Sequence, residues 1–165
     1  MSVKASLAIQ LLVKETVVLD NSVAATDPVI PYGITGMPYN YNATSAVDVT
    51  KGWSNTITLV AGVATVNLAA LTRTSLPTVD LTGLKVRSIH IKATSTNTSP
   101  VTIVPGAANG YAALGLGLSL APGAEALIHN PSTTSAAVSA SLRTLDLASA
   151  HATASVTIVL VAGAT

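Results

Sequence analysis

The chain has 165 residues, of which 49% are hydrophobic and only 9% charged, and its formal net charge is +1. This length suits one domain with its own core, and the low charge excludes the basic surface that holds a nucleic-acid backbone. The absence of cysteine excludes disulfides and cysteine-based metal or nucleophilic sites.

The N-terminal segment "SVKASLAIQLLVK" alternates apolar and polar residues, which predicts a strand with one buried face. Lys14 and Glu15 follow the apolar stretch directly, and no small-residue cleavage site is evident, so we expect no signal peptide. The apolar runs are shorter than the ~20 residues that span a bilayer, so no membrane partner is expected. The apolar positions are Val3, Ala5, Leu7, Ile9, Leu11 and Val13.

Prolines and glycines interrupt the segment at about 21–54, which predicts a long irregular loop region. The segment also contains every large aromatic residue of the chain except Tyr111. Such side chains bury a large area and carry a polar tip, so they suit either a lid over the end of a sandwich or a contact with another subunit. The candidate interaction surface consists of Tyr32, Tyr39, Tyr41 and Trp53.

Strand and turn signals follow at short intervals. "NTITLVAGVATVNLA" predicts a β-hairpin or a bulged strand pair that turns near Ala61 and Gly62, and "LTRTSLPTVDLTGL" predicts a loop. "LKVRSIHIKA" predicts a strand whose apolar residues change parity, which a β-bulge near Arg87 and Ser88 would explain. "STNTSP" is then a turn and "VTIV" the returning strand.

The last third of the chain predicts a turn at Asn109 and Gly110, a glycine-rich strand, and a tight turn at Pro122 and Gly123. Strands are expected at 125–129, within "AAVSASLRTLDLAS", and in the C-terminal "HATASVTIVLVAGAT". About seven to nine short strands indicate an all-β, antiparallel β-sandwich or barrel in a single domain over residues 1–165. No segment has a convincing helical pattern.

No constellation of residues predicts catalysis, a cofactor or a metal. His90, His129 and His151 are scattered, without the spacing of metal ligands. Most acids fall in predicted turns, where capping of the backbone is their usual role, and the hydrolase motif GxSxG is absent. We therefore expect a protein that is not an enzyme.

A set of motifs in the C-terminal half resembles small all-β virion proteins of tailed bacteriophages and prophages. In order, these motifs are "DLTGLKVRSIHIKATSTNTSPVTIVPG", "NGY", "LSLAPGAEALI", "LRTLDLAS" and "VTIVLVAGAT", and the likeness covers 80–165. The resemblance implies a jelly-roll-like sandwich that is built into, or decorates, a phage particle. It implies no catalytic residues.

Three functions follow from these observations. The leading hypothesis is a structural protein of a virion, a capsid decoration or minor capsid protein made in the bacterial cytoplasm, which docks on the shell. Its core lacks Phe and relies on Ala, Val and Leu, so we expect self-association, as a ring or trimer. The alternative is a carbohydrate-binding or adhesive module that stacks sugars on Trp53 and the tyrosines. A hydrolase on a sandwich fold is a third, weaker hypothesis.

Overall fold

A computed structural model describes residues 9–16, 29–34, 37–38, 51–73, 76–130 and 134–164, with the backbone alone for the first three ranges and for position 76. The chain forms two compact units, residues 1–45 and residues 46–165. The described residues contain thirteen strands, more than the seven to nine expected. They are otherwise turns, irregular segments and one 3-10 helix, so the all-β prediction is confirmed.

The first unit contains a three-stranded sheet in the order β2-β1-β3. β1 (Ile9–Thr16) pairs antiparallel with β2 (Val29–Ile34) and parallel with β3 (Met37–Pro38). β2 and β3 lie inside the segment expected to be irregular. Because β2 is an edge strand, it tolerates Pro31, which cannot donate to a ladder.

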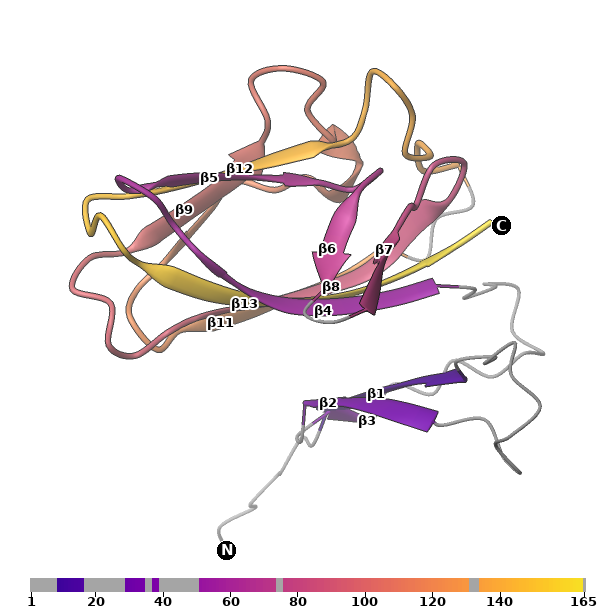
Figure 1. Ribbon diagram of the computed structural model, residues 1–165, viewed down its shortest axis with the longest axis horizontal. Helices are drawn as coiled ribbons and strands as arrows, with labels where there is room; N and C mark the ends of the chain where they lie inside the picture. The colour runs from indigo at the N-terminus through magenta and orange to yellow at the C-terminus, as the bar shows by residue number, and fades with distance from the viewer. Residues whose placement is uncertain are drawn as a thin grey trace, which may run out of the picture. The chain divides into compact units, whose positions relative to one another are not determined.

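The second unit contains two four-stranded antiparallel sheets, in the orders β10-β9-β12-β5 and β11-β8-β13-β4, which form two facing layers in Figure 1. The strands are β4 (Lys51–Thr58), β5 (Val63–Asn67), β8 (Lys85–Ala93), β9 (Val101–Pro105), β10 (Leu118–Leu120), β11 (Glu125–His129), β12 (Thr144–Ser149) and β13 (Ser155–Gly163). All pairings within these two sheets are antiparallel, as predicted.

The chain passes repeatedly from one sheet to the other. The turns β4–β5, β8–β9, β10–β11 and β12–β13 each connect the two sheets, and all four lie at the same end of the unit, on the left in Figure 1. Ala162 near the end of β13 pairs with Lys51 at the start of β4. The chain therefore enters β4 and leaves β13 at the opposite end from the four turns.

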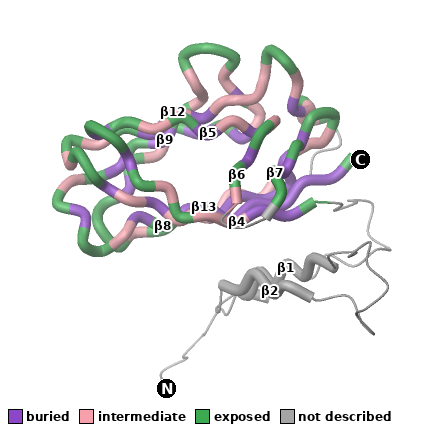
Figure 2. Tube along the Cα trace, viewed as in Figure 1, coloured by how far each residue is buried: buried purple, intermediate pink, exposed green. Residues whose placement is uncertain are grey.

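Buried hydrophobic residues from both sheets belong to one core cluster. Alternate residues of β13 face it, as the sequence predicts, and Leu145 and Leu147 of β12 meet them from the other sheet. In Figure 2 the buried positions follow the strands and the exposed ones follow the connecting loops. Burying each such side chain stabilises the fold by roughly 1.5–3 kcal/mol relative to leaving it exposed.

The predicted β-bulge in β8 is present. Val161 of β13 pairs with Ser88, whereas the next residue, Ala162, pairs with Val86, so Arg87 is the extra residue. The bulge restores the inward orientation of apolar residues on both sides of it: Val86 and Ile89 are both fully buried. The change of parity in the sequence thus reports a real irregularity.

The predicted turn at Ala61 and Gly62 is also present, between a reciprocal pair of hydrogen bonds that join Val60 and Val63. The strands on either side of it do not form an extended hairpin, because β4 and β5 belong to different sheets. The turn is tight because both central residues have positive φ, 52° at Ala61 and 82° at Gly62.

Two short strands, β6 (Leu71–Arg73) and β7 (Leu76–Val79), pair with each other in a segment expected to be a loop. This ribbon lies beside β4, where the carbonyl of Thr72 accepts hydrogen bonds from Trp53 Nε1 at 2.8 Å and Asn55 Nδ2 at 3.2 Å. Arg73 Nη2 donates to the carbonyl of Gly52 at 2.6 Å. The ribbon therefore covers the free edge of β4, which would otherwise invite pairing with other chains.

The glycine-rich segment predicted as one strand is instead a 3-10 helix, Ala112–Leu114, followed by the short strand β10. Gly115 ends the helix in the left-handed conformation, with φ of 61°. No helix among the described residues is long and apolar enough to cross a membrane.

Candidate functional site

Of the four residues of the predicted aromatic surface, the structure describes the side chain of Trp53 alone, and Trp53 belongs to the core. Its side chain is 2% exposed and its indole N–H is bonded to Thr72. Trp53 is therefore available neither to a partner nor to a stacked sugar, which removes one of the residues on which the carbohydrate-binding hypothesis depends. The backbone of Tyr32 lies in β2, and Tyr39 and Tyr41 lie outside the described residues.

Tyr111 is also a core residue, fully buried. Its hydroxyl donates to the carbonyl of Ala136 at 2.8 Å and accepts the N–H of Val86 at 3.2 Å. Burial raises the pKa of the phenol above its usual value. The ring thus joins β8 to the loop before β12, a structural role.

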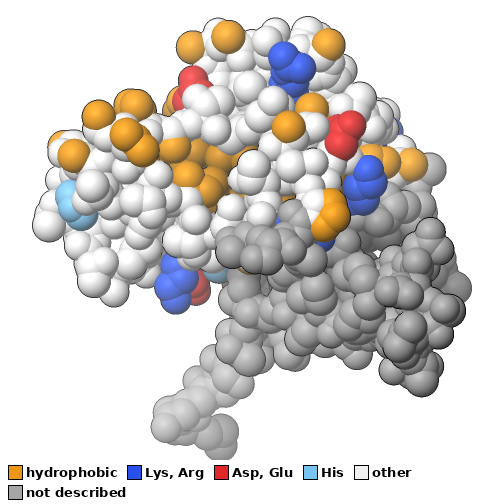
Figure 3. All heavy atoms as spheres, in the orientation of Figure 1, with side chains coloured by type: hydrophobic (Ala, Val, Ile, Leu, Met, Phe, Trp, Pro, Cys, Tyr) orange, Lys and Arg blue, Asp and Glu red, His pale blue; other side chains and the backbone are white. Residues whose placement is uncertain are grey.

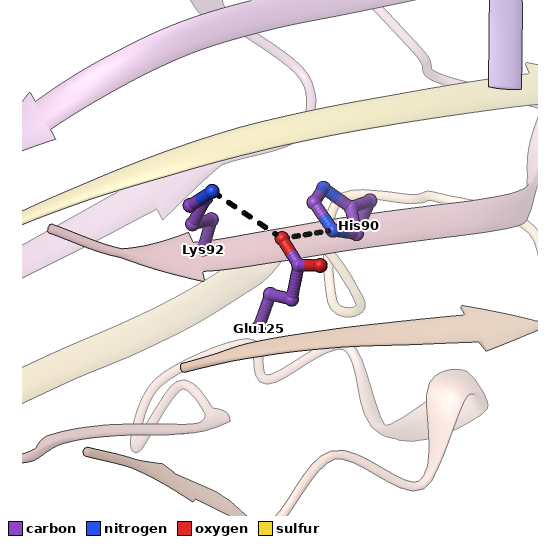
Figure 4. Close-up of polar contacts among 3 residues, drawn as sticks. All are labelled: His90, Lys92 and Glu125. Atoms are coloured by element: carbon purple, nitrogen blue, oxygen red, sulfur yellow. Dashed lines mark ion pairs between the residues drawn. The ribbon is translucent and has the colours of Figure 1, made fainter. Parts of the chain in front are cut away.

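The most distinctive polar cluster is formed by His90, Lys92 and Glu125 on the outer face of the β11-β8-β13-β4 sheet (Figure 4). Glu125 of β11 lies directly across from Lys92 of β8, which makes His90 its diagonal neighbour. Glu125 Oε2 is 3.5 Å from His90 Nε2 and 3.6 Å from Lys92 Nζ, so one carboxylate oxygen serves both.

The His90 side chain is 8% exposed, and its Nδ1 atom is buried without a hydrogen-bond partner. Burial lowers the pKa of His90, and Lys92 acts in the same direction, while Glu125 opposes them. Ser88 lies on the same face, but its hydroxyl donates to the carbonyl of Ile128 at 3.3 Å. The cluster therefore brings one acid to His90 but no activated hydroxyl.

The other histidines lie apart from this ion pair. His129 of β11 is across from Ser88, and burial lowers its pKa. His151 lies in the β12–β13 turn, where its Nδ1 accepts the N–H of Thr98 at 3.3 Å. Within the described part of the chain, no three histidine or acidic side chains are placed to hold a metal ion.

Two described acids bind the backbone, as expected from their usual role. Asp80 Oδ1 accepts the N–H of Thr82 at 2.8 Å in a turn, and hydrogen bonds from the side chain and then the backbone of Thr82 lower the pKa of the carboxyl. Asp146 lies in β12 rather than in a turn, where its two oxygens accept the N–H of Ala107 and the hydroxyl of Thr65 at 2.9 and 2.8 Å. Both carboxylates have structural partners.

The sequence did not predict the His90–Glu125 contact. These residues are far apart in the chain, and only the pairing of β8 with β11 brings them together. One signal was available in the sequence. In "IHIKA" and "EALIH", His90 and Glu125 alternate with apolar residues that face the core, so both are expected on the outer face of their strands. Without the register, however, that parity identifies a face and not a neighbour.

The comparisons identify no relative. No protein-family model matches the sequence, and neither a curated protein nor a solved structure matches it.

Proposed function

We propose that this protein is a non-enzymatic structural component of a bacteriophage particle, a capsid decoration or minor capsid protein, whose second unit is a jelly-roll-like sandwich. The observation that carries the proposal is the order of the eight strands in the two four-stranded sheets. Four pairs of strands that follow one another along the chain each place one member in each sheet.

This order is the one that two Greek keys produce when they wrap around a common core. β4 and β13, the first and last of the eight strands, lie side by side in one sheet, and β5 and β12 lie side by side in the other. Jelly rolls with this arrangement are found in viral capsid and lectin domains. The fold, together with the sequence resemblance of 80–165, therefore supports a role in a particle.

The surface of the second unit supports assembly rather than chemistry. The strand residues on the outer face of the β10-β9-β12-β5 sheet are small and nearly all uncharged, and the only acid, Asp146, has both carboxylate oxygens bound within the chain. These outward residues are Val63, Thr65, Asn67, Thr102, Val104, Ser119, Thr144, Asp146 and Ala148. Such a surface suits contact between proteins more than recognition of a charged ligand.

The proposal is tested by mass spectrometry of particles released by cells that carry the gene and purified on a density gradient. We expect peptides of this chain in intact particles, at a constant ratio to the major shell protein across the gradient peak. An abundant cytoplasmic protein serves as the contamination control. Recovery of the chain only from the soluble lysate would contradict a virion role.

A further inference from the structure

The sequence contains one Asn–Gly pair, Asn109 and Gly110, which lies in the turn after β9. The side chain of Asn109 is exposed. Because glycine has no Cβ, no side chain on the following residue shields its backbone nitrogen. An exposed asparagine in this setting can react with that nitrogen. The other asparagines whose side chains the structure describes have hydrogen-bonded amides, namely Asn55, Asn67, Asn97 and Asn130.

The reaction open to this pair is deamidation through a succinimide ring. The Gly110 nitrogen loses its proton to hydroxide and attacks Cγ of Asn109. As the N–Cγ bond forms, the Cγ–Nδ2 bond breaks, and ammonia leaves with a proton from water, which regenerates hydroxide. Water then opens the ring at one of its two carbonyl carbons, which gives aspartate or isoaspartate. Water is the only co-reactant, so the reaction needs no second protein.

The geometry of the turn favours this reactive pair. A Cβ atom at Gly110 would lie 2.3 Å from the carbonyl oxygen of Gly106, so no larger residue fits there without movement of the backbone. Asn109 has a φ of 56°, in the left-handed region that asparagine tolerates better than most residues. The turn therefore selects both members of the pair for conformational reasons.

The same conformation keeps the reacting atoms apart. A left-handed residue has a ψ of about +30° to +60°, which places the next nitrogen on the opposite side of the Cα–C bond from Cβ. Closure of the succinimide ring needs the nitrogen and Cβ on the same side of that bond. The side chain of Asn109 therefore cannot reach the Gly110 nitrogen until the peptide group between them rotates.

Hydrogen bonds to the start of β12 oppose that rotation. The carbonyl of Asn109 accepts the N–H of Arg143 at 2.7 Å and the N–H of Thr144 at 2.9 Å. The hydroxyl of Thr144 also donates to the carbonyl of Ala108. Rotation about the Cα–C bond would swing the Asn109 carbonyl away from both N–H groups, so the reaction requires an opening of the turn that breaks these bonds.

We propose that Asn109 is a deamidation site that the closed turn protects, and that it reacts when its carbonyl releases the N–H groups of Arg143 and Thr144. The inference does not depend on the proposed function. Each event replaces a neutral amide by a carboxylate and so lowers the formal net charge of +1 by one unit. Charged side chains are few and scattered on the face drawn in Figure 3, so the added charge should separate the product by ion exchange.

The test incubates the full chain at pH 8.5 and 37 °C, folded in buffer and unfolded in guanidinium chloride, and follows each asparagine by peptide mass spectrometry. In the denaturant we expect Asn109 to convert before any other asparagine. In buffer we expect its rate to be lower by about tenfold or more, because only the open fraction reacts.

A pair of threonine variants tests the gate itself. Thr144→Ala removes the hydroxyl that binds the carbonyl of Ala108, and should raise the rate at Asn109 in buffer roughly two- to tenfold without changing it in the denaturant. Thr102→Ala is the matched control, because its hydroxyl donates to the carbonyl of Ala148 at 3.1 Å in the same sheet. We expect the control to react like the wild type.

Several results would overturn the proposal. Equal rates in buffer and in denaturant would do so, as would a denatured chain in which Asn109 stays intact or converts after another asparagine. A Thr144→Ala variant that reacts no faster in buffer than Thr102→Ala would exclude the turn as the gate. If Thr144→Ala does not fold, hydrogen exchange of the Thr144 N–H in the wild type measures the same opening. Its protection should then match the slowing of deamidation to within about tenfold, and a larger disagreement would also exclude the gate.

Discussion

At the scale of single residues, Gly62 shows how one backbone position controls a connection between the sheets. Its φ of 82° is rare for residues with a side chain, and a Cβ atom at this position would lie 2.4 Å from the carbonyl oxygen of Ser149. That carbonyl belongs to the neighbouring turn at the same end. Gly62 therefore satisfies both the turn geometry and the close approach of two chain segments.

Gly62→Ala should destabilise the protein by about 2–4 kcal/mol, because it adds left-handed strain and forces Ser149 to move. Gly83→Ala is the matched control: its φ is 80°, but nothing lies within 4 Å of the added Cβ. The control should cost only ~1 kcal/mol of left-handed strain. Urea unfolding of both variants measures the difference, and equal losses would show that the contact with Ser149 is unimportant.

Residue roles were predictable where local geometry determines them. The bulge at Arg87 and the turn at Ala61 and Gly62 follow from the order of apolar and small residues, and both are observed. The place of Trp53 was not predictable, because it depends on the ribbon β6–β7, which brings the carbonyl of Thr72 to the indole. That ribbon is short and contains Pro77, and proline is depleted in strands, so its strand signal is weak.

At the scale of elements, the turns between the sheets are joined to one another by side chains as well as by the backbone. Asn97 of the β8–β9 turn is 6% exposed and its amide bonds both backbone groups of Ser155, the first residue of β13. The same carbonyl also accepts the N–H of Thr94. One amide thus links the turns at the starts of β9 and β13.

Asn97→Ala should lower the free energy of unfolding by about 1–3 kcal/mol, since it leaves the N–H of Ser155 without its partner. Thr96→Ala changes an exposed residue of the same turn and should have almost no effect. Thermal or urea unfolding compares the two variants. A loss no larger than that of Thr96→Ala would mean that water replaces the amide at no cost.

The paired strands β8 and β11 should make stability depend on pH. The folded protein holds the pKa of both His90 and His129 below their usual 6.5, so the unfolded chain binds more protons just below that pH. Stability should therefore fall as pH decreases from about 6.5 toward the folded pKa values, and should be recovered as pH rises. Urea unfolding at pH 7.5 and at pH 5.5 measures this difference.

The double variant His90→Gln/His129→Gln removes both groups, so its stability should change less between these two pH values. Glu125 and Lys92 remain in place in this variant and provide an unchanged background for the comparison. A wild-type protein that is equally stable at both values would contradict the expectation. So would a double variant with the full pH dependence.

Strand positions were more predictable than strand partners. The period-2 patterns located β8, β9, β11, β12 and β13, because each of these strands places apolar residues in the core at alternating positions. The sheet to which each strand belongs depends on pairings between distant segments, such as β5 with β12, for which the sequence has no local signal. For this reason a hairpin was expected from β4 and β5, which instead separate into the two layers.

At the scale of the whole molecule, the hydrophobic core of the second unit draws all its described members from residues 53–162. It includes residues of both sheets, of the β6–β7 ribbon and of the 3-10 helix region. Because the described core residues of this unit already come from both of its sheets, we expect the unit to fold by itself. The low content of large aromatic residues does not prevent this, since Leu, Ile and Val fill most of it.

A fragment of residues 46–165 should therefore show β-type circular dichroism and a single cooperative urea transition. The full chain, measured in parallel, is the control. A fragment that is unfolded, or that binds hydrophobic dyes and lacks a cooperative transition, would show that the core needs the first unit.

The positions at which the chain enters β4 and leaves β13 have a practical consequence. Both lie away from the four connecting turns, since Ala162 pairs with Lys51. A fluorescent protein or peptide tag joined behind β13 would therefore project from the side that leaves those turns unobstructed. Labelled versions of this molecule could be built without covering the end at which they lie.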